Sequence, residues 1–419
     1  MQSNIKLDRT LVAVNVDGVV HVMLELTAPP STPTQRAPID AVLVLDRSGS
    51  MGGAPMHAVR EAACNLLRLL GPHDRLGVVA FDDNVEVVLQ LASHDVDIAS
   101  AKIRQIGPRG STNLSGGWLK AFELLSSDVR PEAIRRVIVL TDGHANVGVT
   151  DPAQLSAMVG GATEQGVSTT LIGFDDGYDE VLLAALADAG SGNDYWCAGP
   201  DQAPQVFAAE FEGLASVVAQ NISVEIRPRD GVQLAVLNEY PIVDVPGGMQ
   251  VALGDAYGGE TRRMVCMLQM PAHDTAVAVE LGELVVRWAS TVGNVALHTV
   301  TIPVSVGVSD DVDGDQAPDE AVTEQVNILC AVKARKQAHE MLRDGDTAGA
   351  RSAMQGVADM LASMPSQAAE LAQVTADLAE LDRGEWSASS TKRFYSLNRA
   401  AEKGRRSRFD GDETTGQMP

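Results

Sequence analysis

The chain has 419 residues, of which 45% are hydrophobic and only 4% are aromatic. Because a single hydrophobic core rarely grows beyond about 250–300 residues, this length predicts two or three domains. The formal net charge of −24 would repel phosphate backbones and anionic lipids, so it argues against nucleic acid and membranes as partners and favours cationic partners or metal ions.

The first elements are expected in residues 1–37, where apolar and polar positions alternate from residue 11 to residue 27. Asp17-Gly18 lies within this segment and suits the positive backbone angles of a two-residue turn, so the pattern predicts an N-terminal β-hairpin. The first residues lack the basic and apolar stretches of a secretory signal, and no apolar run approaches the ~20 residues of a membrane span. We therefore expect a cytoplasmic protein.

Residues 38–221 follow a Pro-rich connection, and here short apolar runs alternate with helical segments. Continuous runs such as AVLVLD, which ends at Asp46, are typical of strands buried on both faces of a sheet. Their alternation with helices predicts an open, mostly parallel, Rossmann-like α/β domain. The strand expected from Val85 follows its predecessor after only Asp83-Asn84. That connection is too short for a crossover, so we expect an antiparallel edge.

Residues 222–308 return to strand-like segments separated by turns, which predicts a β-sandwich. The N-terminal hairpin has the same character, so we expect it to join this sandwich with the α/β domain inserted between them. An acidic linker leads to residues 319–410, whose apolar periodicity and turn at Gly345 predict a C-terminal helical bundle. Its last segment is basic, and we expect the acidic body to attract it internally. Residues 411–419 are polar, which predicts a disordered tail.

Five oxygen-bearing side chains are expected to meet at the C-terminal edge of the parallel sheet, where such sheets bind their ligands. Asp46, Ser48 and Ser50 follow the first strand, Thr112 precedes a helix, and Asp142 follows the strand RRVIVL. Because the set contains no His or Cys, it suits a hard cation, Mg²⁺ or in its place Mn²⁺ or Ca²⁺. The two carboxylates balance the divalent charge, and Mg²⁺ readily leaves a position open to an incoming Asp or Glu.

Four nearby residues are expected to shape the site without binding the ion. Ser111 and Asn113 flank Thr112, and we expect them to form the turn and cap the next helix. Asp175 and Asp176 end another strand at the same edge. They would add negative field near a cation, but we expect them to act mainly as helix caps.

The motifs around these ligands closely resemble the metal-ion-dependent adhesion site of the von Willebrand factor type A domain family. That site has the pattern D-x-S-x-S, then a Thr, then an Asp in a T-D-G turn, and the resemblance covers about residues 38–221. It implies that the five residues hold the ion, that an acidic side chain of a protein partner completes the ion's shell, and that the protein is not an enzyme. The domain arrangement resembles bacterial members and, more loosely, inter-alpha-trypsin inhibitor heavy chains and calcium-activated chloride channel regulators.

Two other functions are weighed against this one. The first is a non-catalytic adaptor subunit of an AAA+ ATPase of the MoxR or chelatase type, since the resembled family often serves such ATPases; the chain has no Walker A motif, so the motor would be another chain. The second is a metal-dependent phosphohydrolase of the haloacid dehalogenase type, whose nucleophile motif also follows a strand such as VLVLD. That motif needs a second Asp where this chain has Ser48, so we expect binding without catalysis.

Overall fold

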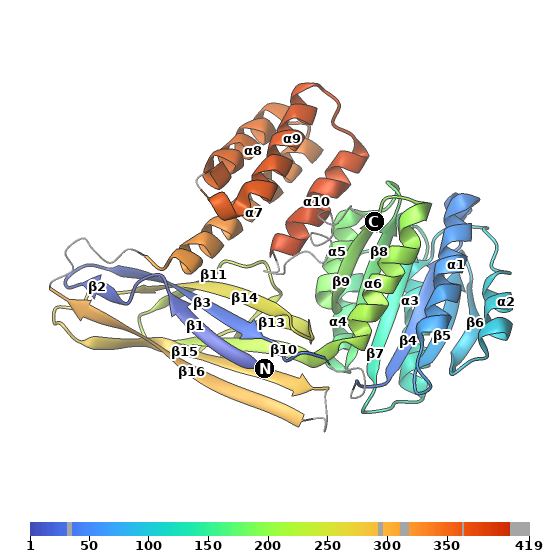
Figure 1. Ribbon diagram of the computed structural model, residues 1–419, viewed down its shortest axis with the longest axis horizontal. Coiled ribbons are helices and arrows are strands. Elements are labelled where there is room, and N and C mark those ends of the chain that lie inside the picture. The colour runs from blue at the N-terminus through green and yellow to red at the C-terminus, as the bar shows by residue number, and fades with distance from the viewer. Residues whose placement is uncertain (32–35, 292–295, 311–317, 363, 403–419) are drawn as a thin grey trace, which may run out of the picture.

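The computed structural model describes residues 1–31, 36–291, 296–310, 318–362 and 364–402. Within them the chain forms an α/β domain, a β-sandwich of two sheets and a bundle of helices (Figure 1). The α/β domain is inserted into the sandwich, because strands from before and after it share the same sheets. The bundle contacts both other parts, and its last helix lies beside the α/β domain (Figure 1). The predicted architecture is confirmed.

The α/β domain is built on a six-stranded sheet with the order β6-β5-β4-β7-β8-β9. Its strands are β4 (Ile39–Asp46), β5 (Arg75–Phe81), β6 (Val85–Ala92), β7 (Ile134–Thr141), β8 (Val167–Phe174) and β9 (Ser191–Cys197). All neighbours are parallel except β6, which pairs antiparallel with β5 at the edge, as predicted. The sequence did not reveal β9, because its segment SGNDYWC contains no apolar run.

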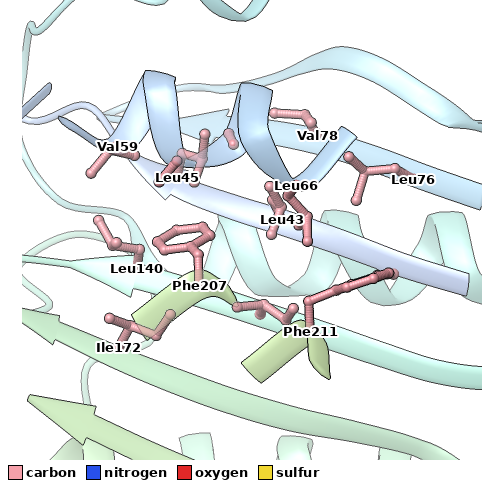
Figure 2. Close-up of a cluster of buried hydrophobic side chains, with 14 of the residues drawn as sticks. Leu43, Leu45, Val59, Leu66, Leu76, Val78, Leu140, Ile172, Phe207 and Phe211 are labelled. Carbon is pink, nitrogen blue, oxygen red and sulfur yellow. The ribbon is translucent and has the colours of Figure 1, made fainter. Parts of the chain in front are cut away.

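Three helices cover each face of this sheet. They are α1 (Ala54–Leu69), α2 (Val96–Ile103) and α6 (Ala203–Ala215) on one face, and α3 (Leu114–Ser127), α4 (Pro152–Glu164) and α5 (Glu180–Ala189) on the other. Alternate strand residues point to opposite faces, so Leu43 and Leu45 join one core and Val42 and Val44 the other. Figure 2 shows the first core, with Phe207 of α6 among the strand side chains. Burial on both faces explains why these strands are continuous apolar runs.

Two helical glycines of this domain lead to opposite stability predictions. A Cβ at Gly117 of α3 would lie 2.8 Å from Phe81 Cδ1 and 3.0 Å from Val44 Cγ1, whereas a Cβ at Gly161 of α4 would meet no atom within 4 Å. Overpacking costs about 1–3 kcal/mol, and replacing a helical Gly by Ala returns about 1 kcal/mol. We expect Gly117→Ala to lower the midpoint of urea unfolding and Gly161→Ala to raise it. Equal shifts in both variants would contradict this packing.

The sandwich consists of a four-stranded sheet, β1-β3-β14-β11, and a six-stranded sheet, β12-β13-β10-β15-β16-β2. Its strands are β1 (Gln2–Leu7), β2 (Leu11–Ala13), β3 (Gly18–Thr27), β10 (Val217–Pro228), β11 (Gln233–Val236), β12 (Ile242–Val245), β13 (Gly248–Tyr257), β14 (Thr261–Met270), β15 (Ala278–Ser290) and β16 (Ala296–Ser309). Strand β10 begins before the predicted boundary at residue 222, because Val217 and Ala219 already pair with β13. The sandwich therefore follows α6 directly.

The predicted hairpin at residues 11–27 is wrong in its first strand. Strand β3 pairs antiparallel with β1, while β2 pairs in parallel with β16 of the other sheet. Gly18 does not turn the chain; it begins β3, where a Cβ would lie 3.1 Å from Val12 Cγ1. Crossing to the second sheet buries Val12 in the sandwich core. Alternation of apolar residues predicts a strand but not its partner, which is why the sequence misled here.

The bundle comprises α7 (Glu320–Arg343), α8 (Thr347–Ala362), α9 (Ala368–Asp382) and α10 (Ala388–Glu402). The predicted turn at Gly345 is present, with φ of 82°. Val322 and Leu329 of α7 pack against Met23 and Val265 of the sandwich. Among residues 1–310 and 318–402, as far as they are described, no helix is long and apolar enough to cross a membrane. The predicted acidic linker after Asp310, residues 403–410 of the predicted helical region and the tail at 411–419 lie outside the described residues.

Candidate functional site

The five predicted ligands come together where strands β4 and β7 end. Ser48 Oγ lies 3.0 Å from Ser50 Oγ, and Ser50 Oγ donates to Asp142 Oδ1 at 2.8 Å. Asp46 is the last residue of β4 and accepts a hydrogen bond from the backbone N–H of Ser48 at 2.8 Å. Thr112 Oγ1 lies 3.5 Å from the position that a Cβ at Gly143 would take, which places it beside Asp142.

The carboxylate of Asp46 is buried and held by hydrogen bonds to both oxygens. Besides the Ser48 contact, the Thr141 hydroxyl donates to Asp46 Oδ2 at 2.6 Å. Burial raises the pKa of Asp46 from its ordinary 3.8 to about 6, and the hydrogen bonds from Thr141 and Ser48 only partly oppose this shift. The hydrogen bonds therefore do not fully offset the cost of burying the charged carboxylate, and this favours a cation nearby. Thr141 belongs to the T-D-G turn noted in the sequence, but its hydrogen bond to Asp46 was not predicted.

The Thr112 loop is fixed by contacts on both of its sides. The backbone N–H of Thr112 donates to Asn146 Oδ1 at 2.9 Å, and the N–H of Asn146 donates to the Thr112 carbonyl at 3.1 Å. Asn113 Oδ1 accepts from Gly116 N at 3.0 Å and caps α3, as predicted. Ser111 N–H donates to Asp83 Oδ1 at 2.9 Å. Asn146 therefore orients Thr112, a role that spacing alone could not predict.

An ion-pair cluster around Asp82 ties the first ligand loop to the Thr112 loop. Asp82 Oδ2 accepts from Arg47 Nε at 2.7 Å and from Arg109 Nε at 2.6 Å. Burial would raise the pKa of Asp82, but the hydrogen bond from Arg109, together with Arg47, lowers it to about 2. Gly49 N–H also donates to the Gly110 carbonyl at 3.2 Å. Both loops are thus held in place by an ionised carboxylate that follows the adjacent strand β5.

The loop between β8 and α5, residues 175–179, approaches the site from a third strand. The predicted caps Asp175 and Asp176 are wrong, because Asp179 caps α5 by accepting from Leu182 N at 3.0 Å. Asp175 instead has a positive φ of 60°. Burial is the main cause of a raised pKa at Asp142, and the charge of Asp175 adds to it. Asp175 therefore contributes the negative field that the sequence suggested, but not the cap.

The geometry of these oxygens fits a hard divalent cation. Ligands at adjacent corners of an octahedron around Mg²⁺ lie about 3.0 Å apart, since its metal–oxygen distances are near 2.1 Å. The spacings of 3.0 Å between Ser48 and Ser50 and 2.8 Å between Ser50 and Asp142 match that value. No three His, Cys, Asp or Glu side chains are grouped to hold a metal in the part of the chain that the structure describes. A metal here would therefore need the hydroxyls, and the exposed Ser50 leaves it open to solvent.

Comparison with known proteins agrees with this arrangement. Residues 40–206 match the family model of the von Willebrand factor type A domain. The chain is 26% identical over 341 residues to the uncharacterized protein sll0103 of Synechocystis sp., covering 77% of this chain and 79% of that protein. It is 27% identical to the E3 ubiquitin-protein ligase WAV3 of Arabidopsis thaliana and 31% identical to inter-alpha-trypsin inhibitor heavy chain H4 of Bos taurus. The matches cover 58% and 36% of this chain but only 32% and 17% of those two proteins.

A solved structure shares the architecture over nearly the full length. The von Willebrand factor type A protein from Catenulispora acidiphila superposes with a TM-score of 0.75 at 17% sequence identity, covering 96% of this chain and 97% of that chain. At this identity the likeness concerns the fold alone. Its coverage nevertheless extends well beyond the α/β domain, so the sandwich and the bundle belong to the shared architecture.

Proposed function

Because residues 40–206 form a von Willebrand factor type A domain, we propose that the chain is a metal-dependent protein-binding module. In this proposal Asp46, Ser48, Ser50, Thr112 and Asp142 hold a divalent cation, Mg²⁺ or in its place Mn²⁺ or Ca²⁺. The observation that supports it most is the contact of Ser50 with both Ser48 and Asp142 at an open edge of the sheet. When bound, the ion supplies positive charge and a free coordination position for a partner's Asp or Glu.

The proposal includes binding without catalysis. Asp46 is in the place that a phosphohydrolase nucleophile would take, but the residue two positions on is Ser48, which has no carboxyl group to protonate a leaving group. Both oxygens of Asp46 also accept hydrogen bonds, from the Ser48 amide and the Thr141 hydroxyl, which hold the carboxylate in place. The ligase activity in the name of WAV3 belongs to that protein, of which this chain covers 32%. We expect no metal-dependent turnover of phosphate esters.

Removal of one hydroxyl tests the ligand set. Thr112→Val keeps the shape of a buried side chain but removes its hydroxyl, so we expect Mg²⁺ affinity measured by calorimetry to fall by at least about tenfold, since losing even an outer partner of a metal typically costs 10–100-fold. The adjacent Ser111→Ala is the matched control, because only the backbone of Ser111 contacts Asp83. Ser111→Ala should bind Mg²⁺ like the wild type. A Thr112→Val variant with unchanged affinity would remove Thr112 from the site.

The class of partner can be tested with paired peptides that differ only in Asp against Asn or Glu against Gln. We expect the immobilised wild-type protein to retain the acidic peptides in Mg²⁺ and to release them in EDTA. It should not retain the amide versions under either condition, since an amide carries no charge to meet the ion. Retention that ignores EDTA would contradict the proposal. A pull-down that recovers an AAA+ ATPase in a Mg²⁺-dependent manner would narrow the function to an ATPase adaptor.

A further inference from the structure

The last helix of the bundle, α10, docks on the α/β domain through a buried lysine. Lys392 Nζ donates to the Tyr178 carbonyl and to Glu180 Oε2, both at 2.7 Å. It also lies 4.0 Å from the centroid of the Tyr178 ring. The Lys392 side chain is only 5% exposed, so these contacts offset the cost of burying its ammonium group. Lys392 therefore holds the C-terminal end of the loop at residues 175–179 from outside the α/β domain.

The loop held by Lys392 contacts Asp142 directly and is connected to Asp46 through Gly173 and Thr141. A Cβ at Gly177 would lie 2.5 Å from the Asp142 carbonyl oxygen, so the loop backbone passes directly against Asp142. The Tyr178 ring covers Gly173, where a Cβ would lie 2.3 Å from the ring. Gly173 in turn pairs with Thr141, the residue that donates to Asp46. A displacement of Tyr178 would therefore disturb the surroundings of both carboxylates of the site.

The loop needs external support to keep this position. Asp175 has a φ of 60°, a conformation that costs a non-glycine residue free energy and persists only where neighbouring contacts impose it. Trp196 Nε1 donates to the Asp175 carbonyl at 3.2 Å, and Lys392 holds the other end of the loop. Residues of strand β9 and helix α10 thus hold the two ends of the same loop.

A second basic residue of α10 provides a natural comparison. Arg399 pairs with Asp188 at 2.6 Å and with Asp194 at 3.1 Å. Asp188 lies near the C-terminal end of α5, whereas Glu180 begins that helix. Both Lys392 and Arg399 therefore anchor α10 to the α/β domain, but the Lys392 contact with Tyr178 lies in the loop that touches Asp142, whereas these two Arg399 ion pairs lie in α5 and β9.

We propose that Lys392 is a positioning residue of the cation site, through which docking of α10 and occupation of the site favour each other. The inference rests on the proposed metal binding. Docked α10 holds the loop at residues 175–179 against Asp142, in the arrangement that keeps the ligands together. With a cation bound, Asp142 would keep that same arrangement, and this would stabilise the surface on which Lys392 docks. Such coupling is reciprocal by thermodynamic necessity.

The test measures Mn²⁺ affinity by calorimetry in full-length wild type, Lys392→Met, Lys392→Arg and Arg399→Met. We expect Lys392→Met to weaken Mn²⁺ binding about fivefold or more, the lower end of usual coupling between sites. Lys392→Arg should recover most of this loss, since a guanidinium can still donate to the Tyr178 carbonyl and Glu180. Arg399→Met should bind within about twofold of wild type, although it also loses a contact of α10.

Hydrogen exchange supplies the reciprocal measurement on the unaltered protein. Mn²⁺ should slow amide exchange in residues 175–179 and in α10, and leave α8 unchanged. If Lys392→Met fails to fold, this measurement decides alone, and exchange in α10 that ignores Mn²⁺ would overturn the inference. Equal Mn²⁺ affinity in a folded Lys392→Met variant and in wild type would overturn it while leaving the proposed function intact. A wild type that binds no Mn²⁺ and no Mg²⁺ would overturn both.

Discussion

Replacing Asp46 by Asn is expected to make the metal-free protein more stable near neutral pH while abolishing its stabilisation by Mg²⁺. Burial raises the pKa of Asp46 from 3.8 to about 6, so the folded state binds this proton more tightly than the unfolded state. The free energy of unfolding therefore falls as pH rises from about 4 to about 6, by at most about 3 kcal/mol. Asn carries no charge to bury, so the variant escapes this loss but offers no charge to a cation.

Thermal unfolding in EDTA and in excess Mg²⁺ measures both effects. In EDTA the Asp46→Asn variant should unfold at a higher temperature than wild type well above pH 6, and at a similar temperature near pH 4. Excess Mg²⁺ should raise the wild-type midpoint, because a ligand that binds only the folded state stabilises it, and should leave the variant unmoved. A variant that is less stable than wild type in EDTA near neutral pH would show that the Asp46 charge is already compensated.

Asp74 provides a control of opposite sign in the same domain. Although its burial raises the pKa, hydrogen bonds from Arg36 and from the N–H groups of Gly71 and Ile39 hold the pKa of Asp74 below its ordinary value. Its contribution to stability is therefore present above that ordinary value and is lost as pH falls. Asp74→Asn should destabilise the protein near neutral pH, with or without Mg²⁺. Comparing the two variants therefore distinguishes Asp74, whose charge stabilises the fold, from Asp46, whose charge is expected to bind a cation.

Replacing Arg136 by Met is expected to destabilise the protein by about 3–5 kcal/mol, because it leaves buried carboxylates without their counter-charge. Arg136 is 0% exposed; its Nη2 donates to Asp255 at 3.0 Å and its Nη1 to Thr170 at 3.0 Å. Glu210 of α6 lies 3.6 Å from the same guanidinium. Strand β7, helix α6 and sandwich strand β13 meet at this residue, so the loss should reach both domains. Urea unfolding measures the loss of stability, and faster hydrogen exchange in β7 and β13 would show that both domains are affected.

A second substitution isolates the charge in this cluster. Asp255→Asn combined with Arg136→Met removes one buried acid together with the base, so the double variant should lose less stability than the sum of the two single changes. Strict additivity would indicate that Arg136 acts through packing alone. Since the same network holds Glu210, we also expect helix α6 to show slow amide exchange in wild type, whether or not Mg²⁺ is present.

The convergence of the proposed ligands was largely predictable because they lie in short motifs at strand ends or just before a helix. Asp46, Ser48 and Ser50 follow one apolar run directly, and Asp142 follows another, so sheet geometry alone brings them together. Asp82 also ends a strand at this edge, and its place after β5 could have revealed its part in joining the two loops. The contact of Lys392 with Tyr178 spans 214 residues. No local pattern can indicate a pairing across that distance.

The same distinction applies to the fold: elements with a local sequence pattern could be predicted, whereas elements defined by distant partners could not. Because β4 and β7 are buried on both faces, they could be recognised as apolar runs, and the periodicity of α7 and α8 with the turn at Gly345 indicated the bundle. Strand β9 was not predicted because its pairing with β8, rather than its composition, makes it a strand. The strands β2 and β3 were recognised as strands but were wrongly paired with each other, and β1, the actual partner of β3 in this region, was not predicted. Choice of partner depends on which face buries Val12, and that is settled only when both sheets are assembled.

The pairing of β3 with β14 has a consequence for how the chain folds. Thr27 aligns with Thr261, so during synthesis β3 remains without its partner β14 until more than half of the chain has been made. Contacts of such large sequence separation form late, because a long loop must close first. The inserted domain has all of its own strands and can fold while the sandwich is still incomplete. Until β14 emerges from the ribosome, one edge of β3 stays open, which makes the early intermediate the species most exposed to aggregation.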